Sequence, residues 1–237
     1  MLLEVCVDSL ASARAAIAGG ADRLELCSAL LAGGLTPYTE LLRQIRHESD
    51  VAVRCLIRPR AGDFLYMPEE IEMMCAQITE LRSAGANGFV IGCLNPDGTL
   101  DCTATARLAK AANSAGLTLH RAIDVSADPL QTYRDAAALG IDTVLTSGAA
   151  ASCVQGVDVL CSPLAERDRP NGPEVLIGAG VAAGVLRQLS AALPGARAYH
   201  MSGKVELESR MVFRREGVPM GLPGLDEWHI QQTDTAS

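Results

Sequence analysis

The sequence predicts an α/β protein that folds as a single (β/α)8 TIM barrel. Eight short β-type runs alternate with Ala-rich helical segments, which is typical of parallel strands joined by crossover helices. The chain has 237 residues, close to the length of about 250 that is common for this barrel. Hydrophobic residues make up 49% of the chain and charged residues 20%, enough apolar material for a large core. The even alternation favours a closed barrel over an open doubly wound sheet.

The predicted strands follow one another at regular intervals along the chain. They span Leu2–Val7, Arg23–Cys27, Val51–Ile57, Gly88–Gly92, Leu117–Ala122, Thr143–Thr146, Glu174–Ile177 and Ala198–Met201. Each is a short apolar run, as expected for strands that are covered by helices on one face and by the barrel interior on the other.

Seven helices are predicted between these strands. They span Ala11–Ala18, Thr39–Glu48, Glu69–Ala84, Thr103–Ala115, Pro129–Leu139, Cys153–Glu166 and Ala183–Leu193. Most are followed by glycine, which adopts a left-handed C-cap without steric cost. These glycines therefore mark the ends of most of the predicted helices.

The eighth helix is predicted to be missing or vestigial. Residues 203–237 contain Pro219, Pro223 and several glycines but no long apolar run of helical period, which predicts an irregular C-terminal tail within one domain spanning 1–237. Without an eighth helix, the outer faces of the first and last strands need cover from the tail or from a partner subunit. We therefore expect a homodimer.

Composition excludes several classes of partner. The net charge of −8 and an aromatic content of 3% disfavour nucleic-acid binding. The apolar stretches are too short to span a membrane, and the start of the chain lacks a signal peptide, so we expect a cytoplasmic protein with no membrane partner. The eight cysteines show no zinc-ribbon or CxxC spacing, which indicates reduced thiols.

The inward positions of the first two strands are polar. Alternation places Glu4, Cys6 and Asp8 on one face of the first strand and Arg23, Glu25 and Cys27 on one face of the second. Buried carboxylates need cations or protons nearby. Interior ion pairs that serve stability alone are the alternative explanation for Glu4, Arg23 and Glu25.

Other strand ends carry further polar side chains, and catalysis in such barrels takes place at these ends. They are Arg58 and Arg60 after the third strand, His120, Arg121 and Asp124 after the fifth, Ser147 after the sixth, and His200 and Ser202 at the eighth. We interpret Glu4, Glu25, His120 and Asp124 as candidate proton-transfer groups. Candidate ligand-binding residues are Asp8, Arg23, Arg58, Arg60, Arg121, Ser147, His200 and Ser202.

Glycines follow the seventh strand, where such barrels often bind phosphate. Gly178 and Gly180 would allow backbone N–H groups to approach an anion, although tight turns also require glycine.

Cys6 and Cys27 end neighbouring strands on the inward side. Two close thiolates suit Cu(I), whereas zinc would require four ligands. Two packed free thiols are the alternative interpretation of this pair.

Several motifs resemble the CutC family, known as copper homeostasis proteins. The motifs are Glu4-Val5-Cys6-Val7-Asp8-Ser9, Gly19–Ser28, Gly33–Pro37, Ile57–Arg60, Gly62–Tyr66, Asp97–Asp101, His120–Asp124, Leu145–Gly148 and His200–Ser202. The resemblance implies a cytoplasmic TIM barrel with a dimeric tendency that handles Cu(I) through Cys6 and Cys27. The chain departs from the family pattern at Gly178-Ala179-Gly180, where a Gly-Gly-Gly run is usual, and in its tail, where the family continues into a terminal helix.

Two function hypotheses follow. The first is a cytoplasmic copper homeostasis protein that binds Cu(I) through thiols at the barrel mouth. The alternative is a TIM-barrel lyase, isomerase or hydrolase that acts on a small anionic or sugar-like metabolite, because Cu(I) does not account for Arg58, His120, Asp124 and His200. Whether the protein is an enzyme is left open, and its partner is a copper ion or a small molecule.

Overall fold

A closed parallel barrel forms the body of the molecule. The structure, a computed structural model, describes residues 1–215, 217–218 and 227–235. The barrel strands are β1 (Leu2–Val7), β2 (Arg23–Leu26), β3 (Ala52–Leu56), β4 (Gly88–Ile91), β5 (Gly116–Leu119), β6 (Thr143–Thr146), β7 (Glu174–Ile177) and β8 (Ala198–Met201). They are hydrogen-bonded in chain order, and β8 returns to β1. The predicted TIM-barrel fold is confirmed.

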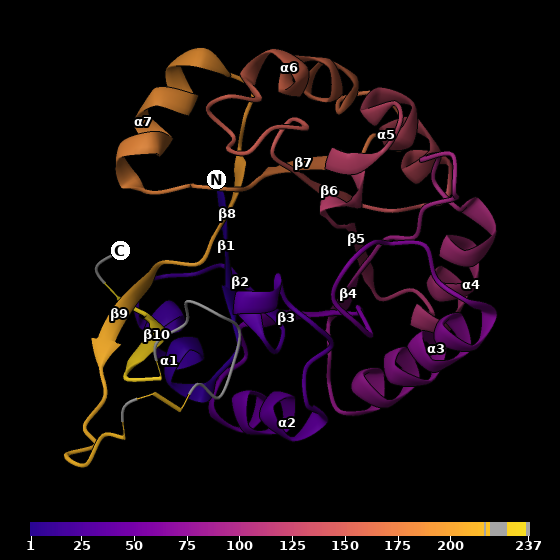
Figure 1. Cartoon of the computed structure of the whole chain (residues 1–237). Coiled ribbons are helices and arrows are strands. Elements are labelled where there is room, and N and C mark those ends of the chain that lie inside the picture. Colours follow the sequence, from indigo (N-terminus) through magenta and orange to yellow (C-terminus); the bar gives the residue numbers. More distant parts are fainter. Residues whose placement is uncertain (216, 219–226, 236–237) are drawn as a thin grey trace.

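In the described residues, seven α-helices surround the strands (Figure 1). They are α1 (Leu10–Ala18), α2 (Thr39–Glu48), α3 (Pro68–Ser83), α4 (Cys102–Ala112), α5 (Pro129–Ala138), α6 (Val157–Glu166) and α7 (Ala183–Ala192). Two short 3-10 helices, η1 (Leu30–Ala32) and η2 (Arg121–Val125), lie in loops after β2 and β5. The main core lies between the strands and the helices, where outward strand residues such as Val7, Leu24 and Leu26 are fully buried.

Two boundaries differ from the prediction in an informative way. The fifth strand ends at Leu119 because the chain turns into η2 after His120, whose side chain accepts a hydrogen bond from Ala122 N–H. Helix α6 begins at Val157, four residues after the predicted start at Cys153. Residues 148–156 instead form a tight loop, and a Cβ on Gly156 would collide with the carbonyl oxygen of Ser147.

Closure of the barrel brings the two ends of the barrel sequence together. Strands β1 and β8 are parallel, with Leu2 opposite Ala198 and Glu4 opposite His200. Glu4 and His200 thereby become neighbours although 196 residues separate them in sequence.

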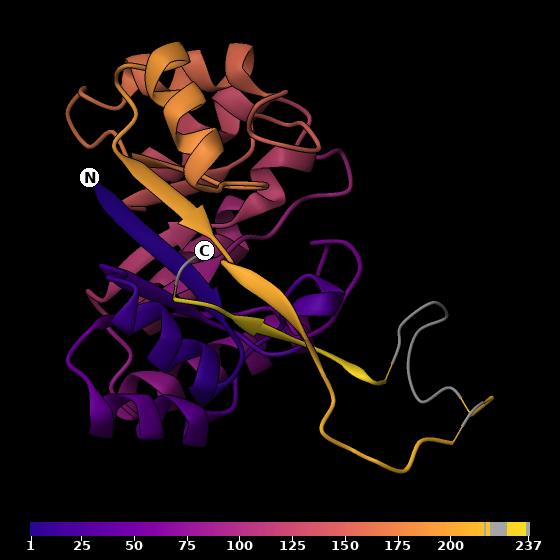
Figure 2. The same ribbon diagram turned by 90° about the vertical axis from the view of Figure 1, so that its left-hand side faces the viewer.

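The tail contains a two-stranded antiparallel ribbon, which we call the C-terminal ribbon: β9 (Lys204–Glu208) and β10 (His229–Thr233). It projects from the side of the barrel (Figure 2), and β10 packs against α1, where Thr233 N–H donates to Ser12 Oγ at 3.1 Å. Within the described part of the chain no helix follows α7, whereas Pro219 and Pro223 lie outside it. The ribbon thus takes up the position next to α1 that an eighth helix would otherwise cover.

Apolar side chains remain exposed on the connection that follows β9. Val212 is fully exposed, and Phe213 and Met211 are more than half exposed. The homodimer stays a prediction. Among the described helices, none combines the length and the apolar character needed to cross a membrane.

Candidate functional site

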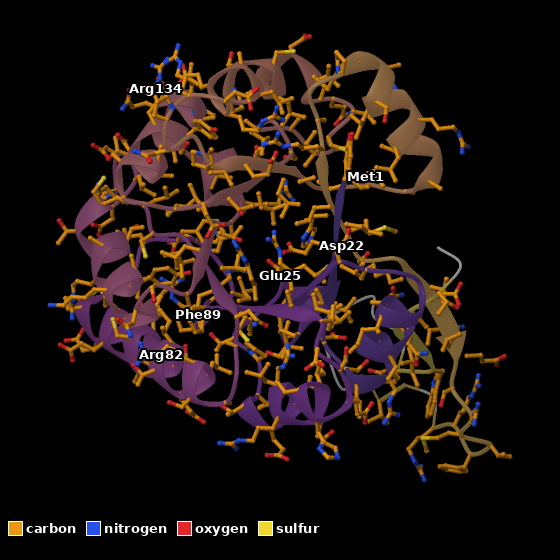
Figure 3. All side chains as sticks on the ribbon, turned by 180° about the vertical axis from the view of Figure 1, so that it is seen from behind. Met1, Asp22, Glu25, Arg82, Phe89 and Arg134 are labelled. Atoms are coloured by element: carbon orange, nitrogen blue, oxygen red, sulfur yellow. The ribbon has the colours of Figure 1, made fainter. Side chains whose placement is uncertain are left out.

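A cavity of about 190 Å³ opens at the carboxyl end of the barrel. Its walls comprise Cys6, Glu25, Leu30, Gly33, Leu56, Arg58, Phe64, His120, Arg121, Leu145 and His200. Figure 3 shows Glu25 near the middle of the ring of strands, whereas Arg82 and Arg134 lie at its periphery. This is the end at which TIM barrels bind ligands. The cavity therefore marks the candidate site.

The inner end of the cavity adjoins a buried ionic cluster. Glu4 is fully buried and accepts a hydrogen bond from Arg23 Nε at 2.5 Å. Its other oxygen lies 2.8 Å from His200 Nδ1. Strand register explains the cluster, because Glu4 is paired with Arg23 on β2 and with His200 on β8. The sequence placed Glu4 and Arg23 inside the barrel, and the closed register adds His200.

The two buried glutamates, Glu4 and Glu25, have pKa values that are shifted in opposite directions. Burial alone would raise the pKa of Glu4, but the hydrogen bond and charge of His200, together with Arg23, hold it below its usual value. Burial raises the pKa of Glu25 to about 7, and Glu4 adds to that rise. Burial opposes protonation of His200, yet the nearby Cys6 and Glu25 raise its pKa well above the usual value. Glu4 is thus the anion and His200 is protonated near neutral pH, whereas Glu25 exchanges its proton in that range.

Cys6, Glu25 and His200 form a compact group of potential metal ligands. One ligand atom from each lies within 4.8 Å of the others. Glu4 occupies Nδ1 of His200, so its Nε2 is directed toward Glu25, at 3.8 Å from Oε2. A carboxylate that fixes the far nitrogen of a metal-binding histidine is a recurrent arrangement in metal sites. The thiol and the imidazole suit Cu(I), whereas the carboxylate suits harder ions.

Cys27 lies apart from this group. Its thiol is fully buried, donates to the Val7 carbonyl oxygen at 3.4 Å, and packs with Leu56 and Val90. Burial raises its pKa, and the charges of Glu25 and Cys6 add to that rise. The two thiols are therefore close enough to interact electrostatically. Cys27 does not line the cavity, whereas Cys6 does.

The outer part of the cavity, which we call the roof, consists of Arg58, Phe64 and His120. The Arg58 guanidinium lies 5.2 Å from the centroid of the Phe64 ring, and the His120 and Phe64 ring centroids are 4.7 Å apart. Burial lowers the pKa of His120 to about 3, and the charge of Arg58 contributes. His120 is therefore neutral at physiological pH and is unsuited to act as a cationic acid.

The carboxylate of Asp124 anchors the loop after β6, and its predicted proton-transfer role stays a prediction. Its carboxylate accepts hydrogen bonds from Thr146 Oγ1 at 2.6 Å, Ser147 Oγ at 2.9 Å and Ala149 N–H at 3.1 Å. Arg121 Nε also donates to it, at 2.7 Å. With both oxygens occupied, Asp124 positions Arg121 and Ser147, and only Arg121 reaches the cavity wall.

Six other predicted ligand-binding residues are not among those that line the cavity: Asp8, Arg23, Arg60, Gly178, Gly180 and Ser202. Arg60 forms ion pairs with Asp63 and Glu70 and so fixes the β3–α3 loop. Gly178 has a packing role, because a Cβ there would lie 2.7 Å from Leu145 Cδ1. The phosphate site after β7 stays a prediction.

Sequence analysis did not select Phe64 as a site residue. It lies in the loop after β3, in the Gly62–Tyr66 segment, and touches both Arg58 and His120. The sequence did contain a signal for this residue. Phe64 follows two strand-end arginines and precedes the next predicted helix, and the chain has only three phenylalanines.

The comparisons with known proteins agree with this architecture. The family model described as the CutC family matches residues 1–205, which include all eight barrel strands. The chain belongs to the CutC family. A family protein named CutC from Chromobacterium violaceum is 40% identical over 236 residues, which cover 99% of this chain and 94% of the relative. A CutC protein from Xanthomonas campestris is 43% identical over 204 residues, which cover 86% and 84% of the two chains.

Solved structures extend the likeness. A CutC protein from Streptococcus agalactiae, named for a proposed role in copper homeostasis, has a TM-score of 0.77 and 25% identity, with 85% of this chain and 98% of that chain covered. A 2,3-dimethylmalate lyase has a TM-score of 0.56 and 15% identity, with 84% and 73% covered. The second likeness shows the barrel fold alone. Membership of the CutC family therefore rests on sequence, and the barrel is a wider architecture.

Proposed function

We propose that this CutC protein takes part in copper homeostasis by binding Cu(I) at the barrel mouth between Cys6 and His200. The main support for this proposal is the compact group of Cys6, Glu25 and His200, whose ligand atoms lie within 4.8 Å of one another. The family name and the Streptococcus agalactiae relative support the connection with copper.

The donor chemistry favours a two-coordinate ion. A thiolate and an imidazole are ligands that Cu(I) accepts, and Cu(I) does not need the full shell that Zn²⁺ requires. Glu4 would orient His200 through Nδ1. Metal binding would displace the proton of His200, whose pKa is raised, so affinity would rise with pH.

Cys27 takes a secondary place in this proposal. Its thiol is protonated and donates to Val7, so its use as a ligand would require loss of that contact and of a proton whose pKa burial has raised. We therefore expect Cys6 to dominate affinity and Cys27 to add to it.

The decisive experiment is an anaerobic Cu(I) titration against a competing chelator. Wild-type protein would be compared with Cys6→Ser, Cys27→Ser and His200→Gln, and with Cys161→Ser as a control for an exposed thiol on α6. Loss of Cys6 should exceed the about 10–100-fold loss that removal of an outer-shell partner causes. Unchanged affinity in Cys6→Ser, or a loss in Cys161→Ser, would refute the site.

The opposite pKa shifts of Glu4 and Glu25 favour a second candidate function. Glu25, with a pKa of about 7, faces the cavity beside His200, and a general base is most effective when its pKa lies near the working pH. Here Glu25 would remove a proton from a bound metabolite and His200 would return one. Exchange of a carbon-bound hydrogen of that metabolite for solvent deuterium, lost in Glu25→Gln, would establish it.

A further inference from the structure

Arg58 carries an uncompensated charge into the cavity roof. Its two Nη atoms donate to the carbonyl oxygens of Ala32, Gly33, Gly34 and Gly62 at 2.8–3.3 Å. Its Nε is buried and has no hydrogen-bond partner. Among the described residues, Arg58 forms no ion pair, although it is only 8% exposed. A buried guanidinium without a carboxylate is costly unless an anion arrives from outside.

His120 adds a second unpartnered donor. Its Nδ1 accepts a hydrogen bond from Ala122 N–H at 3.1 Å, so that nitrogen carries no proton. In the neutral ring the proton therefore resides on Nε2. This Nε2 is also buried without a partner, and His120 is 5% exposed. The backbone of η2 thus fixes the tautomer that directs an N–H group into the roof.

Both donors belong to the wall of the same cavity and share Phe64 as a neighbour. A buried donor left without an acceptor destabilises the protein, so two of them favour a bound acceptor. The Phe64 ring packs against both side chains. An enclosed cavity of about 150 Å³ can hold benzene, so a cavity of about 190 Å³ has room for a small organic molecule.

We infer that the roof binds the carboxylate of a small organic acid, with Arg58 Nε–H and His120 Nε2–H as its two donors. A carboxylate offers two coplanar oxygens and one negative charge, which match two donors and one uncompensated cation. The rest of the ligand would extend toward Cys6, Glu25 and His200. The inference deepens the second candidate function and rests on it for the chemistry that follows binding.

Calorimetric titration of metal-free wild-type protein with glycolate tests the inference at low ionic strength. Glycolamide, the neutral isostere, and inorganic phosphate serve as comparators. We expect glycolate to bind at least tenfold more tightly than either, because only glycolate combines planar oxygens with a single charge. Metal-free protein keeps the result independent of the copper proposal.

Paired variants identify the donors. His120→Asn keeps an acceptor near Ala122 N–H but removes the Nε2–H donor, whereas His120→Gln places an amide N–H near the Nε2 position. We expect at least a tenfold loss of glycolate affinity in His120→Asn and in Arg58→Lys, and partial recovery in His120→Gln. Arg82→Lys on the barrel exterior is the matched arginine control, with unchanged binding expected. Melting temperature confirms that each variant is folded.

Nitrogen-15 spectra of the histidine rings provide a test that needs no variant. The inference requires the His120 proton on Nε2 and a shift of that resonance when glycolate binds. A proton on Nδ1, equal binding of glycolamide, preference for phosphate, or unchanged affinity in both His120→Asn and Arg58→Lys would overturn it. Glycolate binding without deuterium exchange would leave the inference intact and remove the second candidate function.

Discussion

Two arginines, one in β3 and one just after it, meet opposite surroundings at the two ends of the barrel. At the amino end, Arg54 donates to Thr118 Oγ1 at 2.7 Å and to Asp142 Oδ1 at 2.7 Å. At the carboxyl end, Arg58 finds only carbonyl oxygens and keeps one buried N–H group without a partner. The first arginine is neutralised by the fold, and the second is not.

We call the amino end of the barrel the floor and the carboxyl end the mouth. The arginine at the floor contributes to stability, because its ion pair is complete without a ligand, whereas the arginine at the mouth is available for binding. Six buried side-chain polar atoms lack a hydrogen-bond partner in the described part of the chain, and two of them belong to residues that line the cavity at the mouth: Arg58 Nε and His120 Nε2. Both are nitrogen atoms, so the mouth offers donors to a ligand that supplies acceptors.

The largest effect is expected from Arg23→Met, which breaks the buried pair at the boundary between the two regions. Glu4 would keep only His200 as a partner, and loss of one member of a buried pair costs about 3–5 kcal/mol. Urea unfolding measures this change. A Glu4→Gln/Arg23→Met double variant should lose less than the sum of the two single losses, and additive losses would show that the pair is not coupled.

The next effect is a pH dependence that His120 in the mouth contributes. His120 has a pKa of about 3 when folded and about 6.5 when unfolded, so the unfolded chain binds more protons between these values. Its contribution to stability is complete above pH 6.5 and falls by about 1.4 kcal/mol per pH unit as the pH drops toward 3.

Comparison of wild type with His120→Asn isolates this contribution from the carboxylates that titrate in the same range. The difference in unfolding free energy between the two proteins should shrink between pH 6 and pH 4, as expected from the fall of about 1.4 kcal/mol per pH unit. Parallel stability curves would mean that His120 is already protonated in the folded protein.

The smallest effect is expected from Arg54→Met at the floor. Loss of hydrogen bonds to Thr118 and to the partly exposed Asp142 should cost about 2 kcal/mol. Copper and glycolate affinities should remain those of wild type, because Arg54 does not line the cavity. A change in either affinity would show that the floor also contributes to binding, which contradicts the assignment of binding to the mouth.

Much of the barrel could be predicted because each strand carries its own signal. The runs Leu2–Val7, Thr143–Thr146, Glu174–Ile177 and Ala198–Met201 match the structure at both ends, since apolar residues and flanking turns mark them locally. The ribbon β9–β10 gave no such signal, because its exposed strands need not be apolar.

The site was harder to predict because its contacts depend on register. Alternation along β1 and β2 places Cys6 and Glu25 inside, but only the pairing of β1 with β8 brings His200 to Glu4. From the sequence, Cys27 on the neighbouring strand was the expected second metal ligand beside Cys6. The structure instead groups Cys6 with Glu25 and His200. The neutral state of His120 likewise depends on its burial and on the backbone of η2.

The pairing of β1 with β8 also sets an order of events during synthesis. Glu4 and His200 are 196 residues apart, which a ribosome adding 5–20 residues per second covers on the order of 10–40 s. Until then a nascent chain carries the Cys6 thiol and the Glu4 carboxylate, but not the His200 imidazole. The proposed site is therefore complete only after the last barrel strand has been synthesised, and a chain truncated before β8 has the thiols without that site.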